Sequence, residues 1–147
     1  MVDVGPGRGF AINQAGGIVG EDAGLAVLYL SGQTRFLWGP GVATGVNNFN
    51  VVVGAAFSAH GGIQAGIWSE AEGYQDLNGL IDSASGWFLA AATGINDAGQ
   101  IVGWGYSPER GFLQTPFRLD PIPEPSIWAL LALGGGLLGI AWRRRPR

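Results

Sequence analysis

Residues 94–103 read Gly94-Ile95-Asn96-Asp97-Ala98-Gly99-Gln100-Ile101-Val102-Gly103, and a similar decapeptide occurs twice earlier in the chain. The earlier copies are AINQAGGIVG at residues 11–20 and GVNNFNVVVG at residues 45–54. The ten residues of each copy are numbered here as positions one to ten. All three copies have a small residue at position one, Ile or Val at position two and Asn at position three. A turn-like stretch follows, then a hydrophobic pair at positions eight and nine and a Gly at position ten. Self-similarity of this kind is typical of architectures that repeat one supersecondary unit.

Each decapeptide predicts a β-hairpin. Position two ends one strand, and the Asn at position three begins a turn in which its side chain can bond the backbone two residues on. Position six is Gly16, Asn50 or Gly99, residue types that tolerate a positive φ. The hydrophobic pair starts the return strand, and the Gly at position ten indicates a bulge or a close backbone approach. We therefore expect hairpins near residues 11–20, 45–54 and 94–103.

The remainder of residues 1–118 predicts further short strands. The chain holds 27 Gly and six Trp, and aromatic segments follow each hairpin at Arg35–Trp38, Ala65–Trp68 and Arg110–Leu113. The expected fold is mainly β, a partial β-propeller-like array of hairpin repeats. About two and a half units cannot close a ring of four or more blades. Either a missing N-terminal part supplies further blades, or exposed edges pair with another chain.

The repeat units resemble the HAF repeats of bacterial extracellular proteins. GINDAGQIVG at 94–103 is a near-complete match to the first motif of that repeat, and the resemblance covers most of residues 9–118. It implies an extracellular β-repeat ectodomain over residues 1–118. The chain departs from the second motif of the repeat at its His, which is replaced here by Arg35, Gln64 and Arg110.

The C-terminal part of the chain has three elements in series. Residues 119–125 are a proline-rich stretch expected to be an extended linker, and they end in Pro123-Glu124-Pro125. Residues 126–142 carry no charge and, as a helix, would span roughly 25 Å, which predicts a transmembrane helix. The alternative is a buried core helix, but such a helix normally keeps a polar stripe. Residues 143–147 are expected to be a cytoplasmic arginine cluster that fixes orientation through Arg143, Arg144, Arg145 and Arg147.

These three elements together resemble the PEP-CTERM sorting signal of Gram-negative bacteria. The resemblance implies that Pro123, Glu124 and Pro125 are recognised by exosortase, a membrane sorting enzyme, and that the tail is then removed. It also implies a single-pass inner-membrane precursor with a cytoplasmic C-terminus, followed by a protein at the cell surface or in the extracellular space.

Charge and composition exclude several classes of function. All 11 acidic residues but only four of the eight arginines lie in residues 1–125, and the chain has no Lys, which argues against a nucleic-acid partner. The absence of Cys excludes disulfides and thiolate metal sites. Residues 1–8 lack the pattern of a secretory signal peptide. We therefore expect a truncated N-terminus or, alternatively, insertion directed by the C-terminal span.

Catalytic chemistry is not evident in the sequence. His60 is the only His and lies in a Gly-rich loop, and the carboxylates are scattered over loops, so no cofactor or metal is expected. Trp38 and Trp68 are expected in the core, whereas Trp87 and Trp104 are less constrained and could stack on sugar rings.

The sequence favours a non-enzymatic exported protein that contributes to extracellular matrix, biofilm or surface binding. Extracellular polysaccharide is a candidate partner. The alternatives are a secreted polysaccharide-active enzyme and a gene fragment without independent function.

Overall fold

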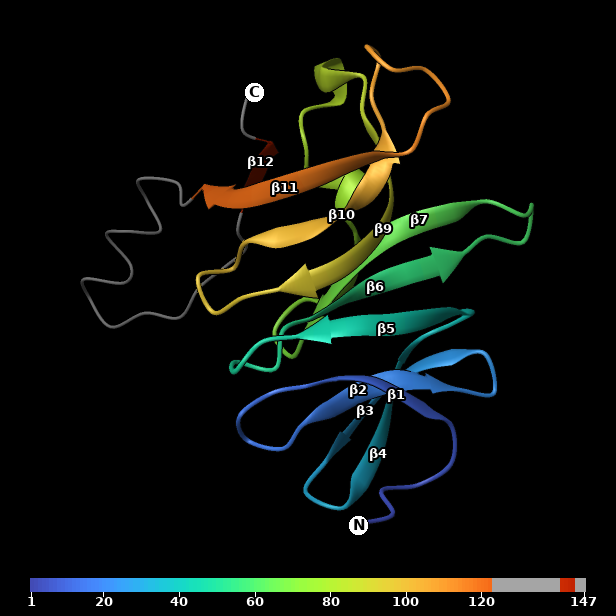
Figure 1. Ribbon diagram of the computed structural model, residues 1–147, viewed down its shortest axis with the longest axis vertical. Helices are drawn as coiled ribbons and strands as arrows, with labels where there is room; N and C mark the ends of the chain where they lie inside the picture. Colours follow the sequence, from blue (N-terminus) through green and yellow to red (C-terminus); the bar gives the residue numbers. More distant parts are fainter. Residues whose placement is uncertain (123–140, 145–147) are drawn as a thin grey trace.

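The computed structural model describes residues 1–122 and 141–144, which form three four-stranded antiparallel sheets with the strands in chain order (Figure 1). The first sheet consists of β1 (Arg8–Ile12), β2 (Ile18–Asp22), β3 (Leu25–Leu30) and β4 (Gln33–Trp38). The second consists of β5 (Gly41–Val46), β6 (Val52–Phe57), β7 (Ile63–Ser69) and β8 (Gly73–Asp76). The third consists of β9 (Phe88–Ile95), β10 (Ile101–Tyr106), β11 (Thr115–Ile122) and β12 (Ala141–Arg144). The prediction of a mainly β chain is confirmed.

Two short 3-10 helices connect the second sheet to the third. They are η1 (Leu77–Gly79) and η2 (Ser83–Ser85), and each begins at an Asp whose carboxylate accepts a backbone N–H two residues on. Asp76 and Asp82 are the two caps. These acidic residues therefore have a structural role at the starts of the helices.

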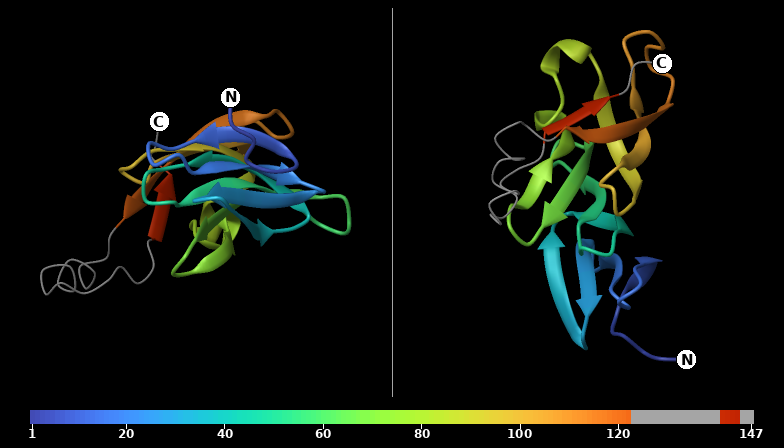
Figure 2. Two further views of the ribbon diagram at one scale, coloured as in Figure 1. Left: turned by 90° about the horizontal axis from the view of Figure 1, so that it is seen from below. Right: turned by 90° about the vertical axis from the view of Figure 1, so that its left-hand side faces the viewer.

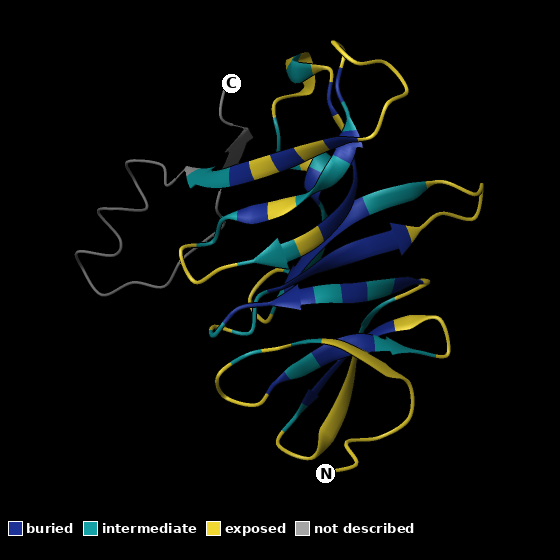
Figure 3. Ribbon diagram, in the orientation of Figure 1, coloured by how far each residue is buried: buried dark blue, intermediate teal, exposed yellow. Residues whose placement is uncertain are grey.

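The three sheets are piled face to face in chain order, with the N-terminus at the end formed by the first sheet (Figure 2). One hydrophobic cluster, which includes Val19, Leu28, Val52 and Trp68, fills the space between the first and second sheets. A second cluster, which includes Val53, Ile67, Leu89, Ile101, Phe117 and Leu119, fills the space between the second and third. The middle sheet is therefore buried on both faces, and its central strand β6 is the most continuously buried strand (Figure 3).

The decapeptides form the first hairpin of each sheet, and their turns lie side by side along one edge of the pile (Figure 1). Each of these hairpins contains a break in strand register, as a bulge requires. At Gly54, the position-ten Gly of the second copy, an added Cβ would lie 2.0 Å from the Val42 carbonyl oxygen. The predicted bulge and the predicted close backbone approach are thus both present.

The structure differs from the sequence-based expectation at the C-terminal end. The stretch expected to be a linker begins inside β11, and its first residue, Leu119, is fully buried in the core. The expected span 126–142 lies outside the described residues except for Ala141 and Trp142, which belong to strand β12 and not to a helix. Arg143 and Arg144 also lie in β12, whereas Arg145 and Arg147 fall outside the described residues. In the described part of the chain, no helix has the length and apolar character needed to span a membrane.

Candidate functional site

The turns of the three decapeptides have the same internal hydrogen bonds. In each turn the side-chain oxygen of the position-three Asn accepts the N–H four residues on, at 2.8 Å from Asn13, 3.0 Å from Asn47 and 2.9 Å from Asn96. Asn47 also accepts the N–H two residues on, the contact expected from the sequence. Position six has a positive φ in all three turns, as predicted for Gly16, Asn50 and Gly99.

The three turns are joined to one another by a ladder of hydrogen bonds from the asparagine side chains. Asn13 Nδ2 donates to the Asn47 carbonyl at 3.0 Å, and Asn47 Nδ2 donates to the Asn96 carbonyl at 3.2 Å. A parallel row runs through position four, where the Gln14 N–H donates to Asn48 Oδ1 at 2.8 Å and the Asn48 N–H donates to Asp97 Oδ1 at 2.7 Å. The same pair of contacts thus occurs at both junctions between sheets. We call this set of contacts the asparagine ladder.

Asp97 is the charged member of the ladder. Its carboxylate accepts the backbone N–H of Asn48 and also the Asn48 side-chain amide at 2.7 Å. The backbone hydrogen bond, and then the side-chain hydrogen bond, hold the pKa of Asp97 below its usual value. Asp97 is therefore a persistent anion on the exposed edge of the molecule and is unsuited to act as a general acid.

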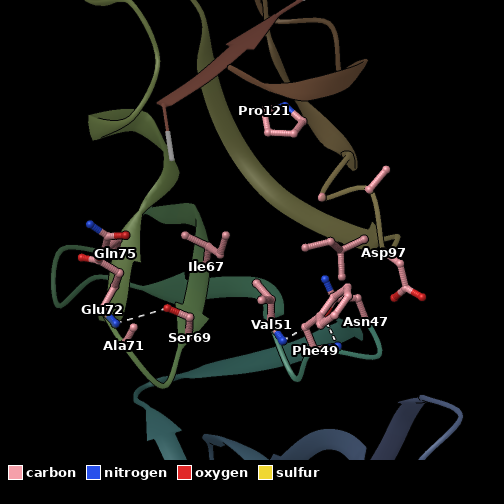
Figure 4. A pocket seen from close by; sticks show the side chains of 13 residues that line it. Asn47, Phe49, Val51, Ile67, Ser69, Ala71, Glu72, Gln75, Asp97 and Pro121 are labelled. Atoms are coloured by element: carbon pink, nitrogen blue, oxygen red, sulfur yellow. Dashed lines mark hydrogen bonds between the residues drawn. The ribbon is translucent and has the colours of Figure 1, made fainter. Parts of the chain in front are cut away.

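A pocket of about 410 Å³ opens beside the ladder, between the second and third sheets (Figure 4). Its floor is mostly apolar and includes Val51, Ile67 and Ile95. Polar side chains that line it include those of Ser69, Glu72, Gln75 and Asp97, and buried Asn47 lies beside them. An apolar floor with a few polar groups is the usual composition of a small-molecule site. We call this hollow the turn pocket.

Phe49 is the residue of the turn pocket that sequence reasoning missed. It occupies position five of the second decapeptide, where the other two copies have Ala15 and Ala98. Its side chain is 73% exposed although it is large and apolar. The signal was present in the sequence as the departure of this copy from the shared pattern, because the other two copies have Ala at this position.

The tryptophans lie mainly in the core. Trp68 is buried between the first and second sheets, and Trp38 packs against the same cluster and donates from Nε1 to the Ala55 carbonyl at 3.1 Å. Trp87 is buried between the second and third sheets. Trp104 is partly exposed and meets Tyr106 edge to face, with ring centroids 6.2 Å apart. Of these four tryptophans, Trp104 is thus the one that lies outside the two core clusters and is exposed enough to contact a partner.

Arg35 joins the first sheet to the second. Its guanidinium lies 5.0 Å from the centroid of the Trp68 ring, and it forms a bidentate pair with Glu70, with Arg35 Nη2 3.0 Å from Glu70 Oε1. A cation on an aromatic face and a two-point ion pair both favour Arg over Lys at this position.

The remaining candidate residues are not brought together. His60 is exposed in the loop between β6 and β7. Residues 1–122 and 141–144 contain no group of three or more His, Cys, Asp and Glu side chains arranged to hold a metal ion. Pro123, Glu124 and Pro125 lie outside the described residues and follow directly on the last residue of β11, Ile122.

Comparison with known protein families identifies the PEP-CTERM protein-sorting motif at residues 121–145. The match begins at Pro121, which lies in β11 and lines the turn pocket, and it includes the Pro-Glu-Pro triplet. Comparison with curated proteins and with solved structures gives no match. The chain thus carries the sorting motif of an exported protein, while the resemblance of residues 9–118 to HAF repeats stays a prediction.

Proposed function

We propose that this chain is the precursor of a non-enzymatic exported protein that exosortase sorts through Pro123, Glu124 and Pro125. The released β ectodomain, built from HAF-like repeats, then contributes to extracellular matrix, biofilm or surface binding. The match of the sorting motif to residues 121–145 is the observation that carries this proposal.

The position of the motif supports the same conclusion. The last core residue of the third sheet is Leu119, and the Pro-Glu-Pro triplet begins four residues later in the sequence. A folded domain followed directly by a processing signal is suited to release of the domain as a unit. Cleavage after the triplet would remove none of the buried residues described for β1 to β11.

The tail can form strand β12 or span the membrane over residues 126–142, but it cannot do both at once. A span would place Arg143 and Arg144 on the opposite side of the membrane from β11, with which they pair in the folded chain. In the precursor, therefore, β11 would be an edge strand of the third sheet. The membrane state is the one that the sorting proposal requires before cleavage.

The turn pocket is the proposed attachment site for an extracellular polysaccharide. Exposed Phe49 offers a ring face for stacking on a sugar, and the amide and carboxylate groups at the rim can bond its hydroxyls. Hydrolysis would need one carboxyl group of raised pKa beside a second carboxylate. The lowered pKa of Asp97 favours binding over the alternative of a polysaccharide-active enzyme.

Sorting is tested in a host that contains exosortase. Glu124→Ala should keep the chain at precursor size in the membrane fraction, whereas the wild type should be shortened and recovered outside the inner membrane. Glu109→Ala, a change of an exposed acid in the loop before β11, is the matched control and should be processed normally. Permanent retention of the tail by the wild type would overturn the sorting proposal.

The binding role is tested with the extracellular polysaccharide of such a host. The wild type should bind it saturably without releasing sugar products, and Phe49→Ala should weaken binding by about tenfold, the equivalent of roughly 1.4 kcal/mol. Phe112→Ala removes a fully exposed ring in the loop before β11 and should leave binding unchanged. Release of shorter sugars would favour the enzyme instead.

A further inference from the structure

The two faces of each sheet make different contacts. The two residues of the hydrophobic pair, at positions eight and nine of the decapeptide, lie on opposite faces. In the second sheet, Val52 at position eight lies in the cluster shared with the first sheet, and Val53 at position nine lies in the cluster shared with the third. Val19 at position nine of the first copy faces the second sheet. Ile101 at position eight of the third copy also faces the second sheet. Position eight therefore packs on the preceding sheet and position nine on the following one.

The same rule leaves one hydrophobic residue without a facing sheet at each end of the pile. Val52, Val53, Val19 and Ile101 are all fully buried. By contrast, Val102 at position nine of the last copy is 46% exposed, and Ile18 at position eight of the first copy is only partly buried. Position two behaves likewise, because Val46 is buried against the first sheet whereas Ile12 is 66% exposed.

The end faces carry further apolar side chains beyond these positions. Strand register places Ile12, Ile18 and Phe36 on the outer face of the first sheet. It places Val102, Trp104, Tyr106 and Phe88 on the outer face of the third sheet, where Arg118 lies opposite Val102. Figure 3 shows exposed residues in β1 and β4 of the first sheet and in β10 and β11 of the third. Exposed apolar side chains gathered on one face of a sheet are typical of an interaction site.

The asparagine ladder is open at both ends in complementary ways. Among the described residues, no side-chain amide reaches the carbonyl of Asn13, the acceptor that Asn47 and Asn96 use at the two internal junctions. At the other end, Asn96 Nδ2 has no following turn and donates within its own turn to Gln100 Oε1 at 2.9 Å. Asn47, between the two, is 5% exposed, whereas Asn96 is exposed. The third sheet thus ends on a donor, and the first sheet begins on an acceptor.

We propose that the partner of these end faces is a second copy of this chain, bound head to tail, with the third sheet of each copy packed on the first sheet of the other. Such a contact continues both internal interfaces: Val102 meets Ile18 of the second copy, and Asn96 donates to the carbonyl of its Asn13. Two copies of the three described sheets make six, and closed rings of four-stranded sheets hold about four to eight blades. The contact is heterologous, but the ring of two is closed and cannot grow into a filament.

The N-terminal segment leaves room for this contact. The Tyr29 hydroxyl donates to the Pro6 carbonyl, and the segment around Gly5 and Gly7 covers the Tyr29 ring on the outer face of the first sheet. Ile12 and Phe36 on that face stay exposed. Val27 and Tyr29 on that face are already buried, so the contact uses the part of the face around Ile12, Ile18 and Phe36.

The test uses cysteines, because the chain has none of its own. Full-length Ile18→Cys and Val102→Cys variants are purified in detergent, mixed and oxidised, after circular dichroism has shown wild-type folding for each. The mixture should give a disulfide-linked pair containing one chain of each kind, and neither variant alone should crosslink. The double variant should give a product of two chains and nothing larger.

Each other result would overturn the proposal. Crosslinking of Val102→Cys with itself would show two third sheets face to face, and a series of larger products from the double variant would show an open chain of copies. An uncrosslinked mixture with the mass of one chain would show that the faces do not associate. As a second measurement, Val102→Asp should reduce the mass in solution to one chain, whereas Phe112→Asp, which changes an exposed residue off both faces, should leave the dimer intact. A dimer that survives Val102→Asp would contradict the proposed contact.

Discussion

The side-chain amide of Asn13 donates to the main-chain carbonyl of Asn47 at 3.0 Å, although 34 residues separate the two in the sequence. The same contact recurs from Asn47 to Asn96 across 49 residues. The repeat is irregular in sequence and regular in space, because the loops between hairpins absorb the difference in length. Each sheet is therefore located against the next by its hydrophobic faces and by polar contacts that include the asparagine ladder.

The central asparagine of the ladder should matter more than the terminal one. Asn47→Ala leaves the N–H groups of Phe49 and Val51 and the Asn96 carbonyl without their partner, and a buried unsatisfied group costs about 1–3 kcal/mol. We expect a loss of about 2–4 kcal/mol in the free energy of unfolding. Asn96→Ala exposes its partners to water and should cost less than about 1 kcal/mol. Urea unfolding of the two variants measures the difference, and equal losses would contradict the ladder.

The position-ten glycines should not accept a methyl group. In Gly54→Ala the new Cβ would lie 2.0 Å from the Val42 carbonyl oxygen, a backbone atom that cannot move aside. Overpacking of this kind costs about 1–3 kcal/mol, so Tm should fall by at least about 5 °C. Gly79→Ala is the matched control, because nothing lies within 4 Å of its added Cβ. A Tm for Gly54→Ala equal to that of the control would refute the close approach.

Asp97 should give the fold a pH dependence in the acid range. Its pKa is lowered in the folded chain by the Asn48 N–H and then by the Asn48 amide, so folding favours the carboxylate. This contribution is present above the unfolded pKa, about 3.9, and is lost as the pH falls through the lower folded value.

The pH effect is isolated by comparison with Asp97→Asn, which cannot titrate at this position. Between about pH 6 and about pH 3 the urea midpoint of the wild type should fall further than that of the variant. Other carboxylates are common to both proteins and cancel in the comparison. Parallel midpoints over the whole range would show that Asp97 does not contribute.

Processing should depend on the distance between the fold and the sorting triplet. Ile122 ends β11 and Pro123 follows it, so the folded third sheet limits access to the triplet. Under the proposed sorting function, a Gly-Ser-Gly-Ser insertion between Ile122 and Pro123 should speed conversion of precursor to product in a pulse-chase experiment. The same insertion between Phe112 and Leu113, in an exposed loop, should leave the rate unchanged. Slower conversion after the first insertion would mean that exosortase needs the fold close by.

The hairpins could be predicted from the sequence because their determinants are local. The Asn at position three, the residue of positive φ at position six and the Gly at position ten lie within one decapeptide, and each acts on the backbone beside it. The prediction for the Asn side chain was incomplete. A contact two residues on occurs only at Asn47, while all three asparagines accept the N–H four residues on.

The proline-rich stretch shows where local rules mislead. Pro121 and its neighbours predicted an extended linker, and the backbone is extended there, but Leu119 packs into the core and pairs with β10. Residues 120–122 continue β11 by pairing with β12. Pro116 and Pro121 lack an N–H, yet a strand tolerates this where the N–H is not needed for pairing. Core packing of Leu119 and pairing with strands distant in the sequence decided the assignment.

The sequence by itself determined the repeat, its hairpin turns and the sorting motif at residues 121–145, because each depends on residues close together in the chain. Only the tertiary structure decided that the three turns form one ladder, that Phe49 stands at a pocket between two sheets, and that Ile18 and Val102 face outward at opposite ends. These relationships join residues that are far apart in the chain. Their physical basis is the stacking of sheets, in which each hydrophobic face is buried only where another sheet covers it.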